Sequence, residues 1–332
     1  MRKLLLTSAA ALMIAACGLP FGLGKPSTSQ LENGAADNMA KAKSFEAQGT
    51  FSESGTNYKF DTRYVAPSTE DIQVTQGNIS YELLQMDGKV YFKGSDYLAS
   101  ILGSDPNAQQ LVKGVGTRWF TSKNATPIDL SAITDANKVK ANFLNTIATK
   151  RTDDVIFNGL DTAELTLVDG IVNITEDSPY KLVRLRSIKG QSLNGVTGFD
   201  MTFSNYGKDF GIQAPTDVFD FDDPTTWPPL YKVDSVAQKA IPGTTSCDDP
   251  CVLSAVIENV GGLKGASAPS TITFTLTNAS DNSSLGTCQV KIQPDKPHAQ
   301  QFTVSCSIQS ATWTNFTGNY NYGANADNPA YD

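Results

Sequence analysis

The side chains that most often carry acid–base or metal chemistry are sparse in this 332-residue sequence. Its single histidine, His298, follows Pro297 in a polar turn. A general base needs a nucleophile within reach and a third group that orients it, and nothing around His298 suggests such an arrangement. The sequence also lacks a G-x-S-x-G elbow, a phosphate-binding Gly-Lys loop and an H-E-x-x-H zinc helix. We therefore expect no catalytic residues, no enzymatic activity, no bound metal and no cofactor.

Cys17 closes an N-terminal segment that has the layout of an export signal. The basic pair Arg2-Lys3 comes first, and an apolar run follows from Leu4 to Ala16. This run is too short to cross a bilayer. Ile14-Ala15-Ala16-Cys17 resembles the bacterial lipobox, which implies that residues 1–16 are removed as a signal peptide and that Cys17 receives a lipid such as palmitate. A plain secretory signal with an incidental cysteine is the alternative.

The other four cysteines lie in the last third of the chain: Cys247, Cys251, Cys288 and Cys306. An even number of cysteines in an exported chain indicates disulfides, with a zinc site as the alternative. If the strands at 285–292 and 301–309 form a hairpin whose turn is centred on Pro297, Cys288 faces Cys306. We therefore predict a Cys288–Cys306 disulfide and, by elimination, a Cys247–Cys251 disulfide.

The charge of the chain bears on its partners. Its net charge of −8 becomes −10 once Arg2 and Lys3 are cleaved off with the signal. An acidic chain without a basic run is a poor ligand for nucleic acid, so we expect neutral, apolar or cationic partners. The acidic run Asp217, Asp220, Asp222 and Asp223 lacks the spacing, the glycine and the glutamate of an EF-hand, and a solvated loop is favoured over a calcium site.

Composition divides the chain into two predicted domains. Residues 17–29 contain Gly, Pro and Ser without apolar periodicity, which is typical of a flexible stalk. A proline-rich linker is predicted at 224–230, on the evidence of Pro224, Pro228 and Pro229. We expect one domain over residues 30–223 and a second over 231–332.

The strongest local signal is Asp87-Gly88, which suits the type I′ turn of a two-residue β-hairpin. This turn sets a register in which Leu83 faces Phe92 and Leu84 faces Tyr91. Strand alternation then gathers an apolar face, made of Ile79, Tyr81, Leu83, Val90 and Phe92. The opposite face carries the cross-strand pair of Glu82 and Lys93, together with Leu84 and Tyr91, and is expected to face water.

A second hairpin is predicted at Asp169-Gly170, again with one apolar face. The predicted pairs are Leu167 with Val172 and Leu165 with Ile174. Single-faced strands of this kind are typical of an antiparallel sheet that is covered on one side. A helix over 129–149 supplies the cover, and its apolar stripe includes Ile133, Phe143 and Ile147. Shorter helices are expected at 31–42 and 97–102.

Several of these segments occur in an order that resembles the LppX/LprG family of bacterial lipoproteins, which is related in fold to the carriers LolA and LolB. The resemblance covers residues 30–222 and rests on Ser44-Phe45 to Gly49, the hairpin Met86–Phe92, Thr117-Arg118-Trp119-Phe120, Pro179-Tyr180-Lys181-Leu182-Val183, and Tyr206-Gly207-Lys208 leading to Ala214-Pro215. It implies an antiparallel half-barrel sheet covered by helices, whose concave face holds the acyl chains of a lipid or lipoglycan. The family has no catalytic residues to carry over.

After Asp223 the resemblance ends and the chain becomes all-β. Strands are predicted at Cys251–Val260, Ser270–Asn278, Leu285–Ile292 and Gln301–Gln309, a layout suited to an Ig-like β-sandwich. The tail from Asn315 to Asp332 either closes a sheet edge or stays loose. The expected fold is therefore mainly β with some α: a LolA-like half-barrel followed by a sandwich.

Two functions follow from these expectations. The first is an extracytoplasmic lipoprotein, anchored to the cell membrane through Cys17, that binds lipid in an apolar cavity. The cavity candidates are Ile79, Tyr81, Leu83, Val90, Phe92, Leu165, Leu167, Val172, Ile174, Ile133, Phe143 and Ile147, any of which could instead be packed core. The alternative is an envelope adhesion or scaffold protein whose sandwich binds a protein or a glycan.

Overall fold

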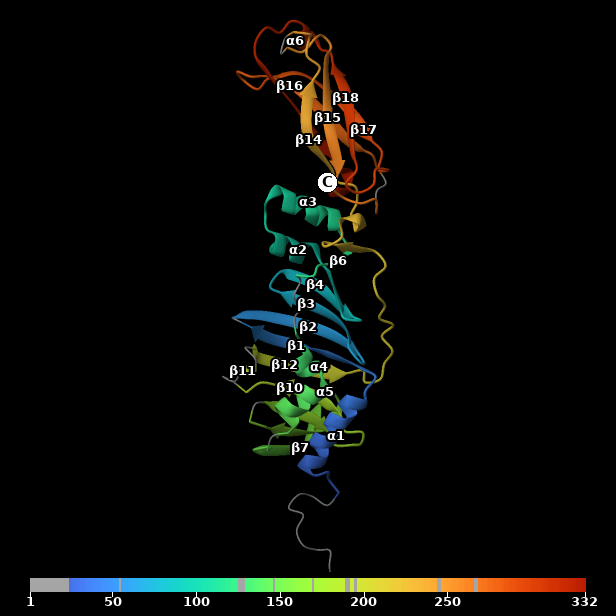
Figure 1. Cartoon of the computed structure of the whole chain (residues 1–332). Coiled ribbons are helices and arrows are strands. Elements are labelled where there is room, and N and C mark those ends of the chain that lie inside the picture. The colour runs from blue at the N-terminus through green and yellow to red at the C-terminus, as the bar shows by residue number, and fades with distance from the viewer. Residues whose placement is uncertain are drawn as a thin grey trace, which may run out of the picture. The chain divides into compact units, whose positions relative to one another are not determined.

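A computed structural model describes residues 24–53, 55–124, 129–145, 147–168, 170–188, 192–193, 196–243, 246–265 and 268–332 (Figure 1). The predicted signal peptide and Cys17 lie outside the described residues. The chain forms two compact units: unit 1 takes Met1–Ser54 and Asp129–Gly207, and unit 2 takes Gly55–Ile128 and Lys208–Asp332. This division does not follow the predicted boundary at 224–230. Among the described residues, no helix has the length and apolar character needed to span a membrane.

The described strands are mostly antiparallel. The strand order of the larger sheet in each unit is given with that unit below. The pair formed by β6 (Trp119–Thr121) and β13 (Val218–Asp220) in unit 2 is parallel, so this sheet is mixed rather than purely antiparallel as predicted.

Unit 1 is an antiparallel sheet with helices. Its helical segments are α1 (Thr28–Lys41), α4 (Ser131–Thr134), α5 (Ala136–Val139) and the π-helix η1 (Lys140–Leu144). Its strands are β1 (Ser44–Glu53), β7 (Lys150–Phe157), β8 (Leu160–Thr166), β9 (Ile171–Thr175), β10 (Leu182–Arg186), β11 (Ser192–Leu193) and β12 (Val196–Ser204). The strand order is β1-β12-β10-β9-β8-β7, and β11 pairs with β12.

Helix α1 begins with a capping box. The Ser27 hydroxyl accepts a hydrogen bond from the Gln30 backbone N–H, and the Gln30 side chain accepts one from the Ser27 N–H. Two backbone donors at the helix start are thereby satisfied. The buried face of the helix consists of Leu31, Ala35, Ala36 and Met39. The helix predicted over 31–42 is therefore present, but it starts one turn earlier.

The single helix predicted over 129–149 is wrong. Asp135 interrupts it with extended backbone (φ −83°, ψ 114°), and its carboxylate accepts the backbone N–H groups of Asn137 and Lys138. A short acidic side chain that bonds nearby backbone donors in this way ends one helix and starts the next. The cover is thus three short pieces, α4, α5 and η1. The last piece ends at Leu144, so Ile147 lies beyond it and is 86% exposed.

The second predicted hairpin has a different register. Leu165 faces Val172 and Ala163 faces Ile174, so the strands are shifted by two residues from the prediction. Gly170 does not have a positive φ; its Cα instead lies close to the Arg186 carbonyl and the Phe143 ring. Asp169 lies outside the described residues. Because a shift of two preserves which face a side chain takes, the predicted apolar face survives the error.

Unit 2 contains the first hairpin. Its first part comprises β2 (Thr56–Val65), β3 (Thr69–Gln76), β4 (Ile79–Met86), β5 (Lys89–Lys93), α2 (Ser95–Leu102), α3 (Pro106–Val115), β6, β13 and the 3₁₀ helix η2 (Pro224–Thr226). The strand order is β13-β6-β5-β4-β3-β2. The β4–β5 register is the predicted one, with Leu83 opposite Phe92. Asp87 and Gly88 have φ values of 52° and 73°, as a type I′ turn requires.

The segment predicted as a proline-rich linker is packed within unit 2. Trp227 stacks on Phe219 of β13 with ring centroids 5.0 Å apart, and its indole N–H donates to the Asp220 carbonyl at 2.7 Å. The backbone of Gly262 lies so close to Thr225 and Trp227 that a Cβ there would collide with their carbonyls. Residues 224–230 are therefore held by specific contacts.

The described residues of the C-terminal part of unit 2 are all-β apart from two short helices. Its elements are β14 (Tyr231–Gln238), β15 (Cys251–Asn259), β16 (Ser270–Asn278), β17 (Ser284–Ile292), β18 (Gln301–Ile308), α6 (Ala311–Thr314), β19 (Tyr320–Asp327) and the 3₁₀ helix η3 (Pro329–Tyr331). They form two three-stranded sheets, β14-β15-β18 and β17-β16-β19. The tail therefore closes an edge, because β19 pairs with β16 along its length. The Ig-like topology stays a prediction.

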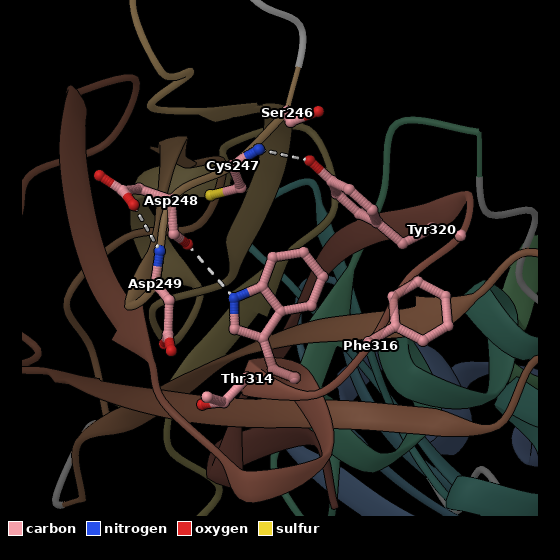
Figure 2. A pocket seen from close by; sticks show the side chains of 9 residues that line it. Ser246, Cys247, Asp248, Asp249, Thr314, Phe316 and Tyr320 are labelled. Carbon is pink, nitrogen blue, oxygen red and sulfur yellow. Dashed lines mark hydrogen bonds between the residues drawn. The ribbon is translucent and has the colours of Figure 1, made fainter.

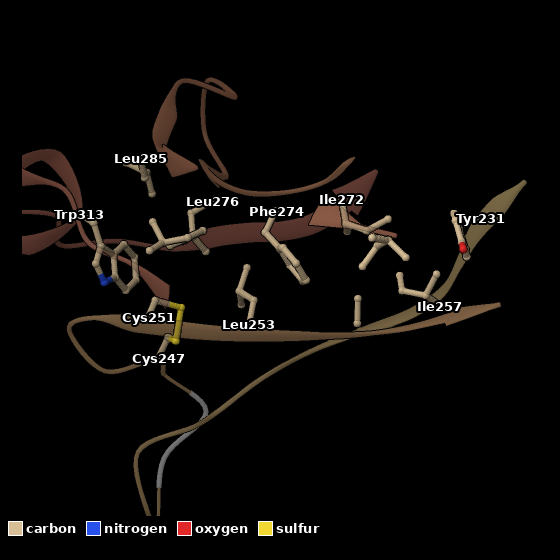
Figure 3. Close-up of a cluster of buried hydrophobic side chains, with 13 residues drawn as sticks. Tyr231, Cys247, Cys251, Leu253, Ile257, Ile272, Phe274, Leu276, Leu285 and Trp313 are labelled. Carbon is tan, nitrogen blue, oxygen red and sulfur yellow. A yellow bond between two sulfur atoms is a disulfide. The ribbon is translucent and has the colours of Figure 1, made fainter. Parts of the chain in front are cut away.

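Side chains from both three-stranded sheets form one buried cluster (Figure 3). Leu253 and Ile257 of one sheet and Ile272 and Phe274 of the other are fully buried in it. Alternation explains the pattern, since every second residue of β15 and of β16 is buried.

Both predicted disulfides are present, Cys247–Cys251 and Cys288–Cys306, with Cα atoms 5.2 and 6.1 Å apart. The register argument for the second was wrong. Cys288 is on β17, which pairs with β16, whereas Cys306 is on β18, which pairs with β15. The two cysteines are therefore on different sheets, and the disulfide links those sheets.

Candidate functional site

The predicted cavity residues of unit 1 belong to one continuous apolar face. In the sheet register, Leu165 is opposite Val172, Val172 is opposite Leu185, and Leu185 is opposite Met201. Directly opposed residues of an antiparallel sheet share a face. We call this set the inner face: Phe45, Ala47, Ala163, Leu165, Leu167, Val172, Ile174, Leu185, Phe199, Met201 and Phe203. None of these side chains is more than 4% exposed.

The cover of the inner face comes from α1, α5 and η1. Helix α1 contacts α5, η1, β9 and β10. Phe143 of η1 is fully buried, and its ring lies edge-on to Phe199 with centroids 5.8 Å apart. Ile133 of α4 is 7% exposed. Of the three helical cavity candidates, Phe143 and Ile133 are buried, whereas Ile147 is exposed and was predicted wrongly.

The cavity candidates of unit 2 are gathered on the apolar face of the β4–β5 hairpin. Leu83 and Phe92 are fully buried, Tyr81 is 7% exposed, and Ile79 and Val90 are half-buried. Tyr97 of α2 covers them, because its ring stacks on Tyr81 at 3.9 Å and on Phe92 at 5.7 Å. Burial raises the pKa of Tyr97. Helix α2 thus plays the covering role in this unit.

The opposite face of that hairpin is less exposed than predicted. Leu84 is only 3% exposed and Tyr91 is half-buried. In the register Leu84 is opposite both Asp71 and Tyr91, so it lies between two neighbouring side chains of the same face. Burial, and secondarily the nearby Glu82, raises the pKa of Asp71, although Arg63 lies 3.4 Å away. Leu84 is therefore no water-facing control for Leu83.

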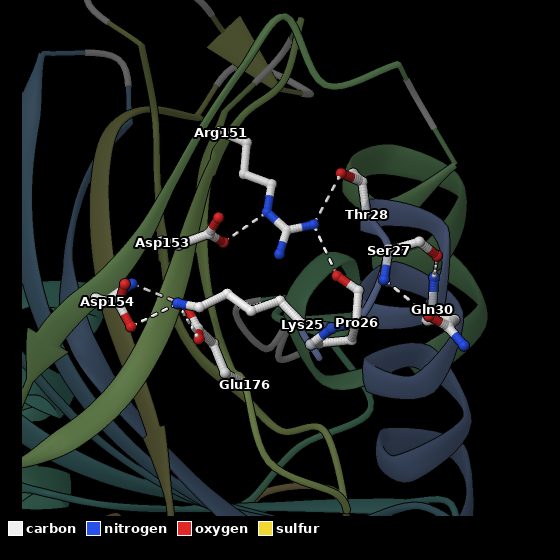
Figure 4. Close-up of polar contacts among 9 residues, drawn as sticks. All are labelled: Lys25, Pro26, Ser27, Thr28, Gln30, Arg151, Asp153, Asp154 and Glu176. Atoms are coloured by element: carbon white, nitrogen blue, oxygen red, sulfur yellow. Dashed lines mark hydrogen bonds and ion pairs between the residues drawn. The ribbon is translucent and has the colours of Figure 1, made fainter. Parts of the chain in front are cut away.

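The start of the described chain is fastened to the sheet of unit 1 (Figure 4). The Lys25 ammonium lies 2.5 Å from Asp154 and 2.9 Å from Glu176, and these two carboxylates raise its pKa to about 12. The Arg151 guanidinium, 8% exposed, donates to the Pro26 carbonyl at 2.9 Å. The predicted stalk over 17–29 is therefore too long at its C-terminal end.

The far end of the C-terminal sheets holds a cavity of about 320 Å³ (Figure 2). Its lining residues are Ser246, Cys247, Asp248, Asp249, Trp313, Thr314, Phe316, Gly318 and Tyr320. The Trp313 indole N–H donates to the Asp248 carbonyl at 3.2 Å, which joins α6 to the loop before β15. The Tyr320 hydroxyl accepts the Cys247 N–H at 2.7 Å.

Sequence reasoning missed this cavity. Its aromatic residues come from a tail that is rich in Asn and Gly, so no apolar periodicity marks them. Its acidic residues stand in the short stretch Asp248-Asp249-Pro250 between two cysteines, which we interpreted only as the loop of a disulfide. The acidic run that we did weigh, Asp217 to Asp223, has local partners instead, such as Arg118 for Asp217 at 3.6 Å.

The comparisons with known proteins concern the fold. No protein-family model and no curated protein matches the chain. Matching solved structures include LprF from Mycobacterium bovis, with 16% identity, a TM-score of 0.38 and coverage of 58% of this chain and 99% of LprF. Two others are MucA/MucB of Pseudomonas aeruginosa (10% identity, TM-score 0.26, coverage 89% and 98%) and a DUF1329 family protein from Desulfovibrio piger ATCC 29098 (11%, 0.22, 56% and 93%).

Proposed function

We propose that this protein is a lipoprotein that is anchored outside the cytoplasm through Cys17 and that binds the acyl chains of a lipid against its inner face. The observation that carries the proposal is the composition of that face. Five neighbouring strands, β1, β12, β10, β9 and β8, contribute its apolar side chains, and all of these side chains are excluded from water. At the edge of the face, Arg151 of β7 lies opposite Leu165. Its role is binding, without enzymatic activity.

The cover of the inner face suits a ligand that must enter and leave. Segments α4, α5 and η1 have four, four and five residues. Helices this short gain little stability from their own hydrogen bonds and depend on what they pack against. A π-helical turn such as η1 is also a frequent feature of functional sites. This part of the cover therefore separates from the sheet at a lower cost than one continuous helix would. Helix α1, with 14 residues and a capping box, is the more stable part of the cover.

Acyl chains supply enough free energy for binding without a specific headgroup contact. Each methylene that leaves water contributes about 0.8 kcal/mol, so ten methylenes contribute roughly 8 kcal/mol. This is of the same order as the association cost of about 4–15 kcal/mol, and a longer or second chain exceeds it. Lipids with long chains are accordingly favoured over short fatty acids.

Two features support the extracytoplasmic location. The lipobox-like stretch Ile14-Ala15-Ala16-Cys17 provides the attachment point. The disulfides Cys247–Cys251 and Cys288–Cys306 are typical of proteins in oxidising compartments.

The test compares bound lipid with the lipid of the anchor. Cys17→Ser removes the anchor, so any acyl chain extracted from that protein is non-covalently bound. Val172→Phe, on the inner face, should fill the lipid site and reduce the lipid extracted per protein molecule. Ile171→Phe is the matched control, because Ile171 is half-buried on the opposite face of the same strand. Mass spectrometry of the organic extract measures the lipid, and circular dichroism shows that each variant is folded.

The result also separates a lipid site from a filled core. In a lipid site, Val172→Phe lowers the lipid content and leaves the melting temperature nearly unchanged. In a filled core, the added ring overpacks the interior and costs about 1–3 kcal/mol. The proposal fails if the Cys17→Ser protein carries no lipid and takes none up from added phospholipid. Cys17→Ser should leave the protein uncleaved or released in soluble form. Normal membrane retention, together with no lipid-dependent mass at the mature N-terminus, would refute the anchor but not the lipid site.

A further inference from the structure

The cavity at the end of the C-terminal sheets offers negative charge and no positive charge. Among the described residues that line it, none is Lys, Arg or His, whereas Asp248 and Asp249 are both exposed carboxylates. An anionic group placed there would be repelled by both, and no cation would offset that repulsion. Phosphates, sulfates and carboxylates are therefore excluded as ligands, and neutral or cationic groups are left.

The hydrogen-bond donors of the lining distinguish between neutral and cationic ligands. The Trp313 indole N–H donates to the Asp248 carbonyl, and the Tyr320 hydroxyl donates to the Gln238 side chain at 2.8 Å. The Thr314 hydroxyl donates to the Ser310 carbonyl at 3.0 Å. These three donors are used within the protein, so they are not available to the oxygen atoms of a sugar or another neutral polyol. The Asp248 carboxylate accepts the Asp249 backbone N–H at 2.9 Å through one of its two oxygens, and both exposed carboxylates keep further acceptor capacity. An ammonium or guanidinium group carries donors only.

The aromatic side chains of the lining also favour a cationic ligand. Phe316 and Tyr320 are half-buried, so part of each ring remains accessible. Trp313 lies beside both, stacked on Phe316 with centroids 6.2 Å apart and edge-on to Tyr320 at 4.9 Å. The face of an aromatic ring attracts a cation, and it also packs against the apolar stem that carries the cation.

The lining is also held in place before any ligand arrives. The Cys247–Cys251 disulfide closes the loop that carries both aspartates. The Ser310 hydroxyl accepts the Trp313 backbone N–H at 3.0 Å and so caps the short helix α6. Trp313 and Tyr320 are each bonded to the backbone of the aspartate-bearing loop. Figure 2 shows the bond between the Tyr320 hydroxyl and the Cys247 N–H. A preformed site loses less conformational entropy when it binds.

We propose that this cavity binds a primary ammonium or guanidinium group at the end of an apolar stem. Its volume of about 320 Å³ is at the small end of ligand sites, which suits one lysine or arginine side chain or one small amine. The carboxylates of Asp248 and Asp249 pair with the cation, and the rings of Phe316 and Tyr320 contact the stem. This site is independent of the lipid site on the inner face.

The test is isothermal titration calorimetry on the full mature chain that carries Cys17→Ser. The probes are a short peptide with one central arginine, the same peptide with citrulline, the free amine spermidine, and maltose. We expect the arginine peptide to bind and the citrulline peptide, which has the same shape without the charge, to bind at least tenfold more weakly. Spermidine separates the two sources of the cation: tighter binding than the peptide assigns the site to free amines.

Variants test whether the cation binds in this cavity. Asp249→Asn removes one charge-assisted hydrogen bond and should weaken binding roughly tenfold or more. Phe316→Leu keeps an apolar side chain without the ring face and should weaken it about threefold. Asp327→Asn, an exposed aspartate on β19 outside the lining, is the matched control and should have no effect. Four outcomes would each overturn the proposal. They are maltose binding without cation binding, equal affinity for the arginine and citrulline peptides, equal affinity in all variants, and no heat with any probe.

Discussion

A methyl group added at Gly114 should destabilise the protein, although glycine is a poor helix former. Gly114 is in the last turn of α3, and its Cα faces the ring of Tyr331 in η3. An ideal Cβ at this position would lie 2.5 Å from Tyr331 Cδ1 and closer still to Cε1. The ring cannot easily move away, because it is 2% exposed and its hydroxyl donates to the Pro228 carbonyl at 3.1 Å.

Two opposing effects set the magnitude. In an exposed helix, Gly→Ala stabilises by up to about 1 kcal/mol because the unfolded chain loses freedom. Overpacking a buried contact costs about 1–3 kcal/mol. Since the clash involves the body of a fixed ring, we expect the second effect to exceed the first and Gly114→Ala to lose about 1–2 kcal/mol. For a unit of this size, that loss corresponds to a melting temperature lower by roughly 2–8 °C.

The assay is a double-mutant cycle measured by urea denaturation. In a Tyr331→Ala background the ring is absent, so Gly114→Ala should become neutral or stabilising by up to about 1 kcal/mol. Gln110→Ala, on the exposed side of the same helix, is the control and should change stability little. Stabilisation by Gly114→Ala in the presence of Tyr331 would show that the contact is absent in solution and that the reasoning is wrong.

Two further predictions concern charged residues. Burial raises the pKa of Asp71 above its usual 3.8, so the native state binds this proton more tightly than the unfolded state and the charged form reduces stability. Asp71→Asn should therefore stabilise the protein at pH 7, and this gain should disappear as the pH falls to 3.8; a gain that persists at low pH would contradict the assignment. Lys25→Ala should release the N-terminal segment from Asp154 and Glu176, and limited proteolysis should then show faster cleavage before α1. The control is Lys41→Ala, at an exposed position at the other end of α1, which should not change the cleavage rate.

Short-range features of the fold could be predicted because neighbouring residues decide them. Asp87 and Gly88 adopt the positive φ of a type I′ turn at little cost, and a two-residue turn leaves only one register for β4 and β5. Ser27 and Gln30 likewise begin α1 through their own hydrogen bonds, a local signal that we did not use when we predicted the helix from residue 31. Alternation of apolar residues then assigned Leu83, Leu165 and their neighbours to buried faces without reference to the rest of the chain.

Predictions were wrong where contacts that the sequence pattern does not show determine the local structure. We interpreted Gly170 as a turn glycine, but a side chain at this position would crowd the Arg186 carbonyl and the Phe143 ring. The β8–β9 register differs from the predicted one by two residues. The stripe over 129–149 suggested one helix, but the Asp135 carboxylate satisfies backbone donors and divides it. Ile147 consequently lies outside the cover.

By itself the sequence determined the apolar strand faces and the first hairpin. It also predicted the correct cysteine pairs, although the register used for Cys288 and Cys306 was wrong. The tertiary structure alone decided that Cys288 and Cys306 join two different sheets, and that Trp313 and Tyr320 meet the loop of Asp248 in one cavity. The physical reason is the range of the interactions. Turn geometry, capping and alternation act within a few residues, whereas sheet membership and cavity lining depend on contacts between segments that are dozens of residues apart.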